Sequence, residues 1–214
     1  MSKSLREVGW WLAGAAYPWK SLHDAGYVVD FVYPFDANPL IVAYEDCDEV
    51  IKEFLAYLDV TNKLNGTLKL FNVNCKDYEA IHFAGGHGVL WNFPDNKNLQ
   101  KITKSIWESG KIVSAICHGV SGLMNVKLST GKYLIKDMCV TSFTDKEGKE
   151  VDTCQIIPFL LQSELMLRGA QFQMSQNWKV NVIQEGQLIT GQNPESGKTL
   201  GVELVKMLDK NYTE

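Results

Sequence analysis

Short apolar segments alternate with amphipathic segments along the first half of this chain, and this alternation restricts the fold more than any other feature. The apolar, β-rich runs lie at 27–33, 80–84 and 111–116. The segments with helical periodicity or helix-start signals lie at 13–25, 46–58 and 96–110. Strands that are apolar throughout are typical of parallel sheets covered on both faces. The sequence therefore predicts an α/β sandwich with a mostly parallel central sheet.

The second half continues the pattern. Further strands are expected near 138–142, 170–174, 179–184 and 187–190, and helices over 158–168 and 197–209. The 214 residues suffice for one α/β domain with a sizeable core. No repeat, linker or low-complexity segment interrupts them, so residues 1–214 are expected to form a single domain.

The segment 46–58 is predicted to form one amphipathic helix. Asp46 or Asp48 is placed to cap its start, because an aspartate oxygen can accept the free N–H groups of a first helical turn. Four apolar residues then share one stripe at helical spacing: Ile51, Phe54, Leu55 and Leu58.

Two turns at the carboxyl ends of predicted strands are candidate binding sites, because ligands of open parallel sheets bind at that edge. Gly85-Gly-His-Gly88 follows the strand at 80–84, and Cys117-His-Gly119 follows the strand at 111–116. Glycine-rich turns let backbone N–H groups approach a ligand closely. Gly86, His87 and Gly88 are therefore candidates for an oxyanion hole, and a glycine-rich turn with no ligand is the alternative.

Cys117 has the context of a nucleophile elbow, a tight turn between a buried strand and a helix. Ala115 and Gly119, two residues to either side, are small enough for strand and helix to cross closely. The turn is expected to expose the thiol and to direct N–H groups at it, which would lower its pKa. His118 is the neighbouring proton-transfer candidate. On spacing alone, a buried structural cysteine remains the alternative.

Composition excludes several other functions. The net charge of −4, with acidic and basic residues interspersed, gives no reason to expect nucleic acid. No stretch approaches the ~20 apolar residues of a membrane span, although the run 8–16 superficially resembles a short signal peptide.

The remaining cysteines and histidines point to no metal site. The five cysteines are Cys47, Cys75, Cys117, Cys139 and Cys154, and no two form a C-x-x-C pair. Reduced thiols in the cytoplasm are the simplest reading, with no metal or other cofactor. His82 lies inside a strand and is interpreted as a core histidine.

Four motifs together resemble the PfpI superfamily, the class I glutamine-amidotransferase-like group that includes the Parkinson's-disease deglycase. They are Ala84-Gly-Gly-His-Gly-Val-Leu-Trp-Asn-Phe-Pro94, Ala115-Ile-Cys-His-Gly119, Val140-Thr-Ser-Phe-Thr144 and Leu188-Ile-Thr-Gly-Gln-Asn-Pro194. The resemblance runs from about residue 9 to residue 208. It is strongest to the heat-shock chaperone/glyoxalase III branch.

That resemblance implies a flavodoxin-like sandwich, often homodimeric, which converts methylglyoxal to lactate without a cofactor. It also implies deglycase and holdase chaperone activities, with unfolded or glycated proteins as partners. Cys117 would attack the aldehyde carbon, and His118 would shuttle a proton between the two carbons. Backbone N–H groups near Gly86, His87 and Cys117 would hold the oxyanion. Trp91 would form part of the pocket wall, unless it is plain core.

The chain departs from the family pattern at acidic positions. Gly14 stands where the family carries a glutamate that serves the cysteine, and Gly148 stands where an acid orients the histidine. Glu147, one residue earlier, is the candidate replacement for the orienting acid. Two further family acids are replaced by Asn92 and Gln162.

Two classes of function follow from these departures. One is a cysteine-dependent enzyme acting on a small carbonyl compound. The other is a catalytically degenerate relative that acts as a holdase chaperone or a thiol-based stress sensor. A carboxylate within hydrogen-bond reach of Cys117 and His118 would favour the enzyme.

The resemblance also places the family's first, central strand before Gly9, where this chain has only eight residues. Unpaired backbone groups on both sides of a gap would be costly. We therefore expect a rearranged sheet, a strand donated by a partner chain, or exposed edges that associate.

Overall fold

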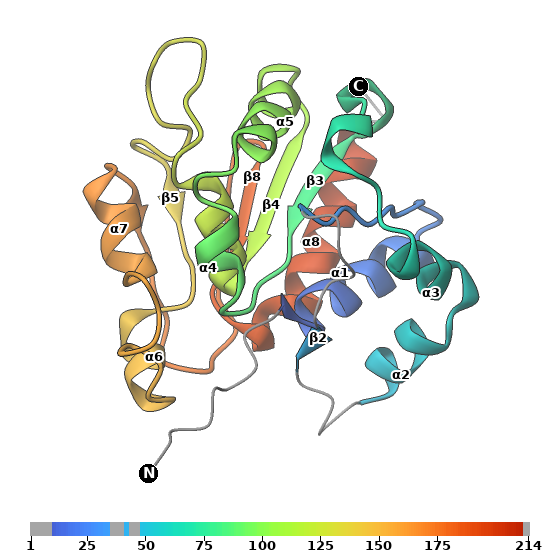
Figure 1. The fold of residues 1–214 in the computed structure, drawn as a ribbon, viewed down its shortest axis with the longest axis horizontal. Helices are drawn as coiled ribbons and strands as arrows, with labels where there is room; N and C mark the ends of the chain where they lie inside the picture. The colour runs from blue at the N-terminus through green and yellow to red at the C-terminus, as the bar shows by residue number, and fades with distance from the viewer. Residues whose placement is uncertain (1–9, 35–40, 43–47, 212–214) are drawn as a thin grey trace.

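A four-stranded sheet lies at the centre of the computed structural model, which describes residues 10–34, 41–42 and 48–211 (Figure 1). The strand order is β3 (Ala80–Phe83), β4 (Ile112–Ile116), β8 (Leu188–Gly191), β7 (Val182–Glu185). β3 and β8 both run parallel to β4, and β7 is antiparallel to β8. Two shorter pairs are parallel: β1 (Trp10–Trp11) with β2 (Ile41–Val42), and β5 (Cys139–Val140) with β6 (Gln171–Phe172).

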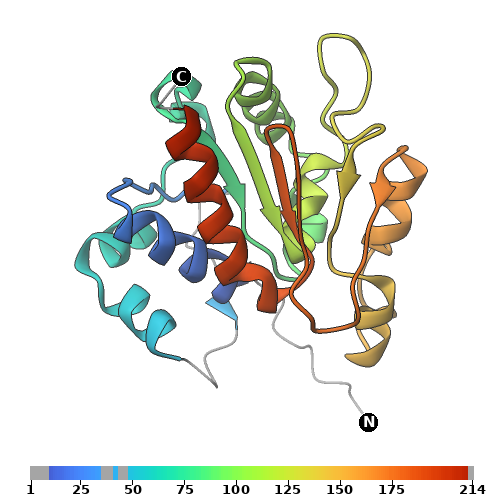
Figure 2. The same cartoon turned by 180° about the vertical axis from the view of Figure 1, so that it is seen from behind.

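Helices cover both faces of the central sheet. α1 (Ala13–Asp24) and α8 (Gly197–Asn211) lie on the face seen in Figure 2. α4 (Val89–Asn92), α5 (Lys97–Glu108) and the 3-10 helix η3 (Cys117–Leu123) lie on the opposite face. The elements further from the sheet are α2 (Glu49–Ala56), α3 (Leu58–Asn65), α6 (Asp145–Glu150), α7 (Leu161–Leu167) and the 3-10 turns η1 (Leu70–Asn72), η2 (Cys75–Asp77) and η4 (Pro194–Ser196).

The central strand β4 explains this layering, since all five of its residues are buried. Ile112 and Ile116 pack with Leu200 of α8 in one core cluster. Val113, which points to the other face, packs with Ile106 of α5 in a second cluster. The expected mostly parallel sheet with helices on both faces is confirmed.

Most predicted elements are confirmed with ends that differ by one to three residues, but the helix expected over 46–58 is divided. Asp48 caps α2, where its carboxylate accepts the Ile51 N–H at 3.0 Å. Tyr57 then adopts an extended conformation and ends that helix. α3 begins at Leu58, whose side chain is 73% exposed, so its assignment to the buried stripe is wrong. Residue 46 lies outside the described residues.

The strand expected at 27–33 is also wrong. That run makes only an isolated bridge between Val32 and Leu68, and Val28 is 84% exposed. A strand needs a paired neighbour, and no strand in the described part of the chain pairs with the outer edge of β3. The anticipated gap does not separate β3 from β4, which pair directly with Ala80 opposite Ile112. The sheet is thus continuous from β3 to β7.

Gly119 sits where η3 crosses the end of β3, and a larger residue would not fit. A Cβ atom at this position would lie 2.2 Å from the Phe83 carbonyl oxygen and 2.7 Å from that of Ala84. We predict that Gly119→Ala lowers the free energy of unfolding by about 3 kcal/mol or more, because backbone must move. Gly66→Ala is the matched control, since the nearest atom to its added Cβ is 3.6 Å away. Equal denaturation midpoints for the two variants would contradict the proposed crossing.

Candidate active site

Cys117 occupies the turn between β4 and η3 with a φ of +57°, a conformation that non-glycine residues seldom adopt. Strain of this kind concentrates at functional sites. Ala115 is fully buried in the preceding strand, and Gly119 allows the close crossing described above. The predicted elbow geometry is therefore present.

The environment of the thiol differs from the prediction of an exposed, acidic cysteine. Cys117 is only 7% exposed. Burial is the largest cause that raises the pKa of its thiol to about 12, and the negative charge of Glu147 raises the pKa further. Hydrogen bonds from the backbone N–H groups of His118 and Gly86 lower the pKa, but by less. The expectations of exposure and of a lowered pKa are both wrong, because desolvation outweighs the two donors.

The glycine turn after β3 lies directly against this cysteine. A Cβ atom at Gly85 would be 2.8 Å from the Cβ of Cys117 and 3.3 Å from its sulfur. Gly86 has a φ of +118°, and its N–H is one of the two that favour a negative charge on the sulfur. Gly88 caps α4. The glycine turn and the elbow thus lie in direct contact at the carboxyl ends of β3 and β4.

His118 lies beside the thiol, with its Nδ1 3.5 Å from the Cys117 sulfur. Its ring packs against those of His87 and Phe143, at centroid distances of 4.7 Å and 4.6 Å. Burial, reinforced by His87, lowers the pKa of His118 well below its usual value. At neutral pH the site therefore holds an uncharged thiol next to an uncharged imidazole.

Glu147, the candidate orienting acid, is fully buried but makes no hydrogen bond to His118. One oxygen accepts the backbone N–H and the hydroxyl of Thr144, at 3.0 and 2.8 Å. The other accepts the Trp178 N–H and the side-chain amides of Gln192 and Asn193, at 3.0, 3.1 and 2.8 Å. Five donors occupy the carboxylate, so it holds α6 and two loops together.

The two glycines at family acid positions differ in surroundings. A Cβ atom at Gly14 would lie 3.1 Å from the Gly85 nitrogen and 3.3 Å from the Ile116 side chain, so this position does adjoin the site. A Cβ atom at Gly148 would lie 3.3 Å from the sulfur of Cys154. Trp91, the expected pocket wall, is 48% exposed on α4.

Sequence reasoning missed two aromatic residues near the site. Phe143 packs against His118 and also against Trp178, whose ring centroid is 5.6 Å away. Trp178 has a φ of +59°, rare for a bulky residue, and its N–H is held by Glu147. Phe143 lies within the family motif Val140–Thr144, so the sequence could have identified it as a site residue. No motif in the local sequence identifies Trp178.

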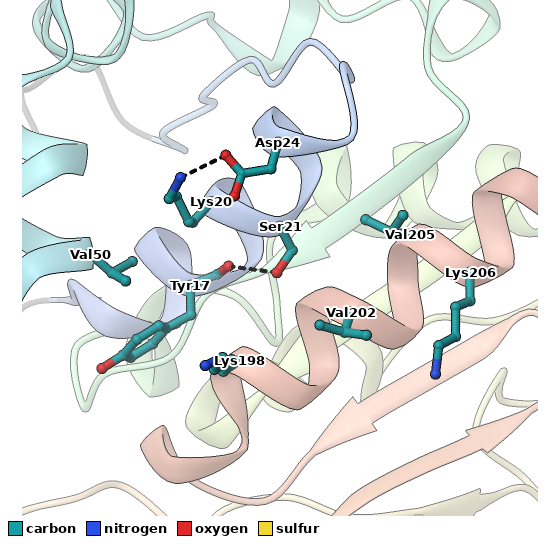
Figure 3. Close-up of a pocket in the computed structure, with 9 residues that line it drawn as sticks. All are labelled: Tyr17, Lys20, Ser21, Asp24, Val50, Lys198, Val202, Val205 and Lys206. Atoms are coloured by element: carbon teal, nitrogen blue, oxygen red, sulfur yellow. Dashed lines mark hydrogen bonds and ion pairs between the residues drawn. The ribbon is translucent and has the colours of Figure 1, made fainter.

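A groove of about 380 Å³ between α1 and α8 is separate from this site (Figure 3). Its lining contains no cysteine or histidine, and its Lys20 is paired with Asp24 at 2.6 Å. It therefore offers no thiol or imidazole for the chemistry of the Cys117 site.

Outside the elbow, the described cysteines Cys75, Cys139 and Cys154 are free thiols, and Cys47 lies outside the described residues. No cluster of three or more metal-binding side chains occurs in residues 10–34, 41–42 and 48–211. Over the same ranges, no helix has the length and apolar character needed to cross a membrane.

Known proteins share both this sequence and this fold. The chain is 30% identical over 225 residues to the glutathione-independent glyoxalase HSP31 of Saccharomyces cerevisiae, covering 94% of this chain and 90% of the yeast protein. The solved structure of the Francisella tularensis Rapid Encystment Protein 24 kDa superposes with a TM-score of 0.90 at 34% identity, covering 97% and 93% of the two chains.

Candida albicans glyoxalase III shares the fold, with a TM-score of 0.87 at 23% identity over 96% of this chain and 91% of that one. The model of the DJ-1/PfpI family matches residues 12–207. This match spans almost the whole chain and includes the elbow, the glycine turn and Glu147. The chain belongs to the DJ-1/PfpI family.

Proposed function

We propose that this protein is a cysteine-dependent, glutathione-independent glyoxalase that converts small 2-oxoaldehydes such as methylglyoxal to 2-hydroxy acids. The observation that carries the proposal is the pairing of Cys117, on a strained turn, with His118 Nδ1 at 3.5 Å and with two backbone N–H groups near its sulfur. The similarity to a yeast protein named as such a glyoxalase supports the same reaction.

In the first step, the Cys117 sulfur bonds to the aldehyde carbon, and the thiol proton passes through His118 to the aldehyde oxygen, giving a hemithioacetal. The neutral imidazole has a free lone pair on Nδ1 when its proton is on Nε2. The N–H groups of Gly86 and His118, which favour a negative charge on the sulfur, are the donors that we assign to the developing oxyanion. No cofactor is needed, because the carbonyl itself accepts the electron pair.

In the second step, His118 removes the hydrogen of the former aldehyde carbon as a proton and returns it to the neighbouring carbon. The hydroxyl proton on the first carbon moves to the ketone oxygen, so that the first carbon becomes a thioester carbonyl and the ketone becomes an alcohol. Water then cleaves the thioester, releasing the hydroxy acid and restoring the thiol. The net reaction adds one water to the oxoaldehyde.

The burial of Cys117 and its raised pKa argue against a thiol sensor. Redox-sensing cysteines are acidic and accessible, whereas Cys117 is buried and its pKa is raised to about 12. Activation therefore has to accompany substrate entry, with the proton leaving sulfur as the S–C bond forms.

Among the described residues no carboxylate bonds to His118, and this favours the remaining alternative, a catalytically degenerate relative that binds unfolded or glycated proteins. A cytoplasmic homodimer with a single domain remains part of the proposal for either function. The two functions differ in whether the thiol turns over a substrate, and this difference is measurable.

We predict that Cys117→Ala lowers kcat/KM for methylglyoxal by at least about 10³-fold, since no nucleophile remains. Lactate formation by purified protein measures this. Cys154→Ala is the matched control and should keep wild-type activity, because that thiol contacts Gly148 and Asp145 rather than Cys117. Wild-type protein no faster than Cys117→Ala would refute the glyoxalase proposal and leave the binding function.

We predict that Glu147→Gln lowers the free energy of unfolding by about 2–3 kcal/mol, because an amide cannot accept all five hydrogen bonds. Lys146→Gln, on the same helix but exposed, should change it little. Chemical denaturation compares the two variants. A large fall in kcat for Glu147→Gln with unchanged stability would show instead that this carboxylate takes part in the chemistry.

A further inference from the structure

His82 lies one strand away from Cys117, and the proposed mechanism does not use it. It sits in β3 directly opposite Ser114 of β4. Its Nδ1 is 2.8 Å from the Ser114 hydroxyl, and its Nε2 is 2.8 Å from the carbonyl oxygen of Gly14 in α1. A side chain of β3 therefore ties a helix to two strands of the sheet.

Chemistry fixes the tautomer of this ring. A carbonyl oxygen can only accept a hydrogen bond, so Nε2 carries the proton and Nδ1 accepts from the Ser114 hydroxyl. Burial lowers the pKa of His82 to about 4, with the Gly14 bond opposing it, so the ring stays neutral near pH 7. Both nitrogens are thus committed to these two bonds.

The Gly14 carbonyl needs this donor because of Pro18. In an α-helix the carbonyl of one residue accepts the N–H of the residue four positions later. Pro18 lies inside α1, four residues after Gly14, and has no N–H. Gly14 is itself buried, where an unpaired carbonyl would be costly.

This bond lies close to the Cys117 site. The Trp11 N–H, just before α1, donates to the Gly85 carbonyl at 2.9 Å. A Cβ atom at Gly14 would be 3.1 Å from the Gly85 nitrogen, so the first turn of α1 rests on the glycine turn. The glycine turn packs on Cys117, and its Gly86 N–H donates to the Cys117 sulfur.

We propose that His82 is a positioning residue: by supplying the donor that Pro18 cannot, it holds α1 against Gly85 and Gly86 and keeps the Gly86 N–H aimed at Cys117. The catalytic consequence rests on the proposed function, while the structural coupling does not. The two ring nitrogens of His82 bond Ser114 and Gly14 rather than Cys117, so it acts through α1 and the glycine turn.

The test is a double-mutant cycle of His82→Phe and Pro18→Ala, read by amide hydrogen exchange in the folded protein. His82→Phe removes the donor, so the exchange rate of the Gly86 amide should rise at least about 10-fold relative to that of Val113. Val113 is the reference because its N–H donates to the carbonyl of Gln187, the residue before β8, in the centre of the sheet. Pro18→Ala restores an intrahelical N–H for Gly14, so the double variant should return Gly86 to near its wild-type exchange.

The outcomes distinguish this inference from the proposed glyoxalase. If the protein is an active enzyme, kcat should fall at least about 10-fold in His82→Phe and recover in the double variant. If no variant turns over methylglyoxal, the exchange rate of Gly86 alone still tests the coupling between His82 and the glycine turn. Unchanged exchange at Gly86 in His82→Phe, or a change that Pro18→Ala does not reverse, would overturn the proposal. Should His82→Phe fail to fold, His82→Gln, which keeps a donor, must fold and exchange like the wild type at Gly86.

Discussion

The close approach of two backbone turns is the constraint on which the rest of this structure depends. The turn after β3 and the turn after β4 meet with glycine at each contact, Gly85 against Cys117 and Gly119 against the end of β3. Side chains at either glycine would push the turns apart. Because they meet, the Gly86 N–H reaches the sulfur of Cys117, the residue that directly follows β4.

The resulting site is closed and uncharged. Cys117 and His118 are both buried, burial raises the pKa of the thiol, and burial lowers the pKa of the imidazole. Instead of a carboxylate, the flanking rings of His87 and Phe143 contact the His118 ring. The buried acid Glu147 stabilises the fold, since it accepts hydrogen bonds from three separate segments. The site thus keeps its nucleophile and donors while lacking the charges that would ionise the thiol beforehand.

The sequence anticipated what depends on local pattern and missed what depends on distant partners. β4 and its elbow were predictable, because an apolar run, small residues and a glycine are adjacent in the chain. The strand at 27–33 was predicted wrongly because its formation requires a neighbour that β3 does not supply in the described residues. The burial of Cys117 was missed for the same reason: the aromatic cluster beside it includes Phe143 and Trp178, which come from loops far along the chain.

The most direct test of this account is the ionisation of Cys117 itself, read from the ultraviolet absorbance of the thiolate. Subtracting the titration of Cys117→Ala from that of the wild type isolates this one thiol from the other four cysteines. The account predicts that it stays protonated above the ordinary cysteine pKa of 9.0 and ionises only toward 12, because burial outweighs the two N–H donors. Ionisation near or below neutral pH would contradict it, and would show that the resting site holds a thiolate.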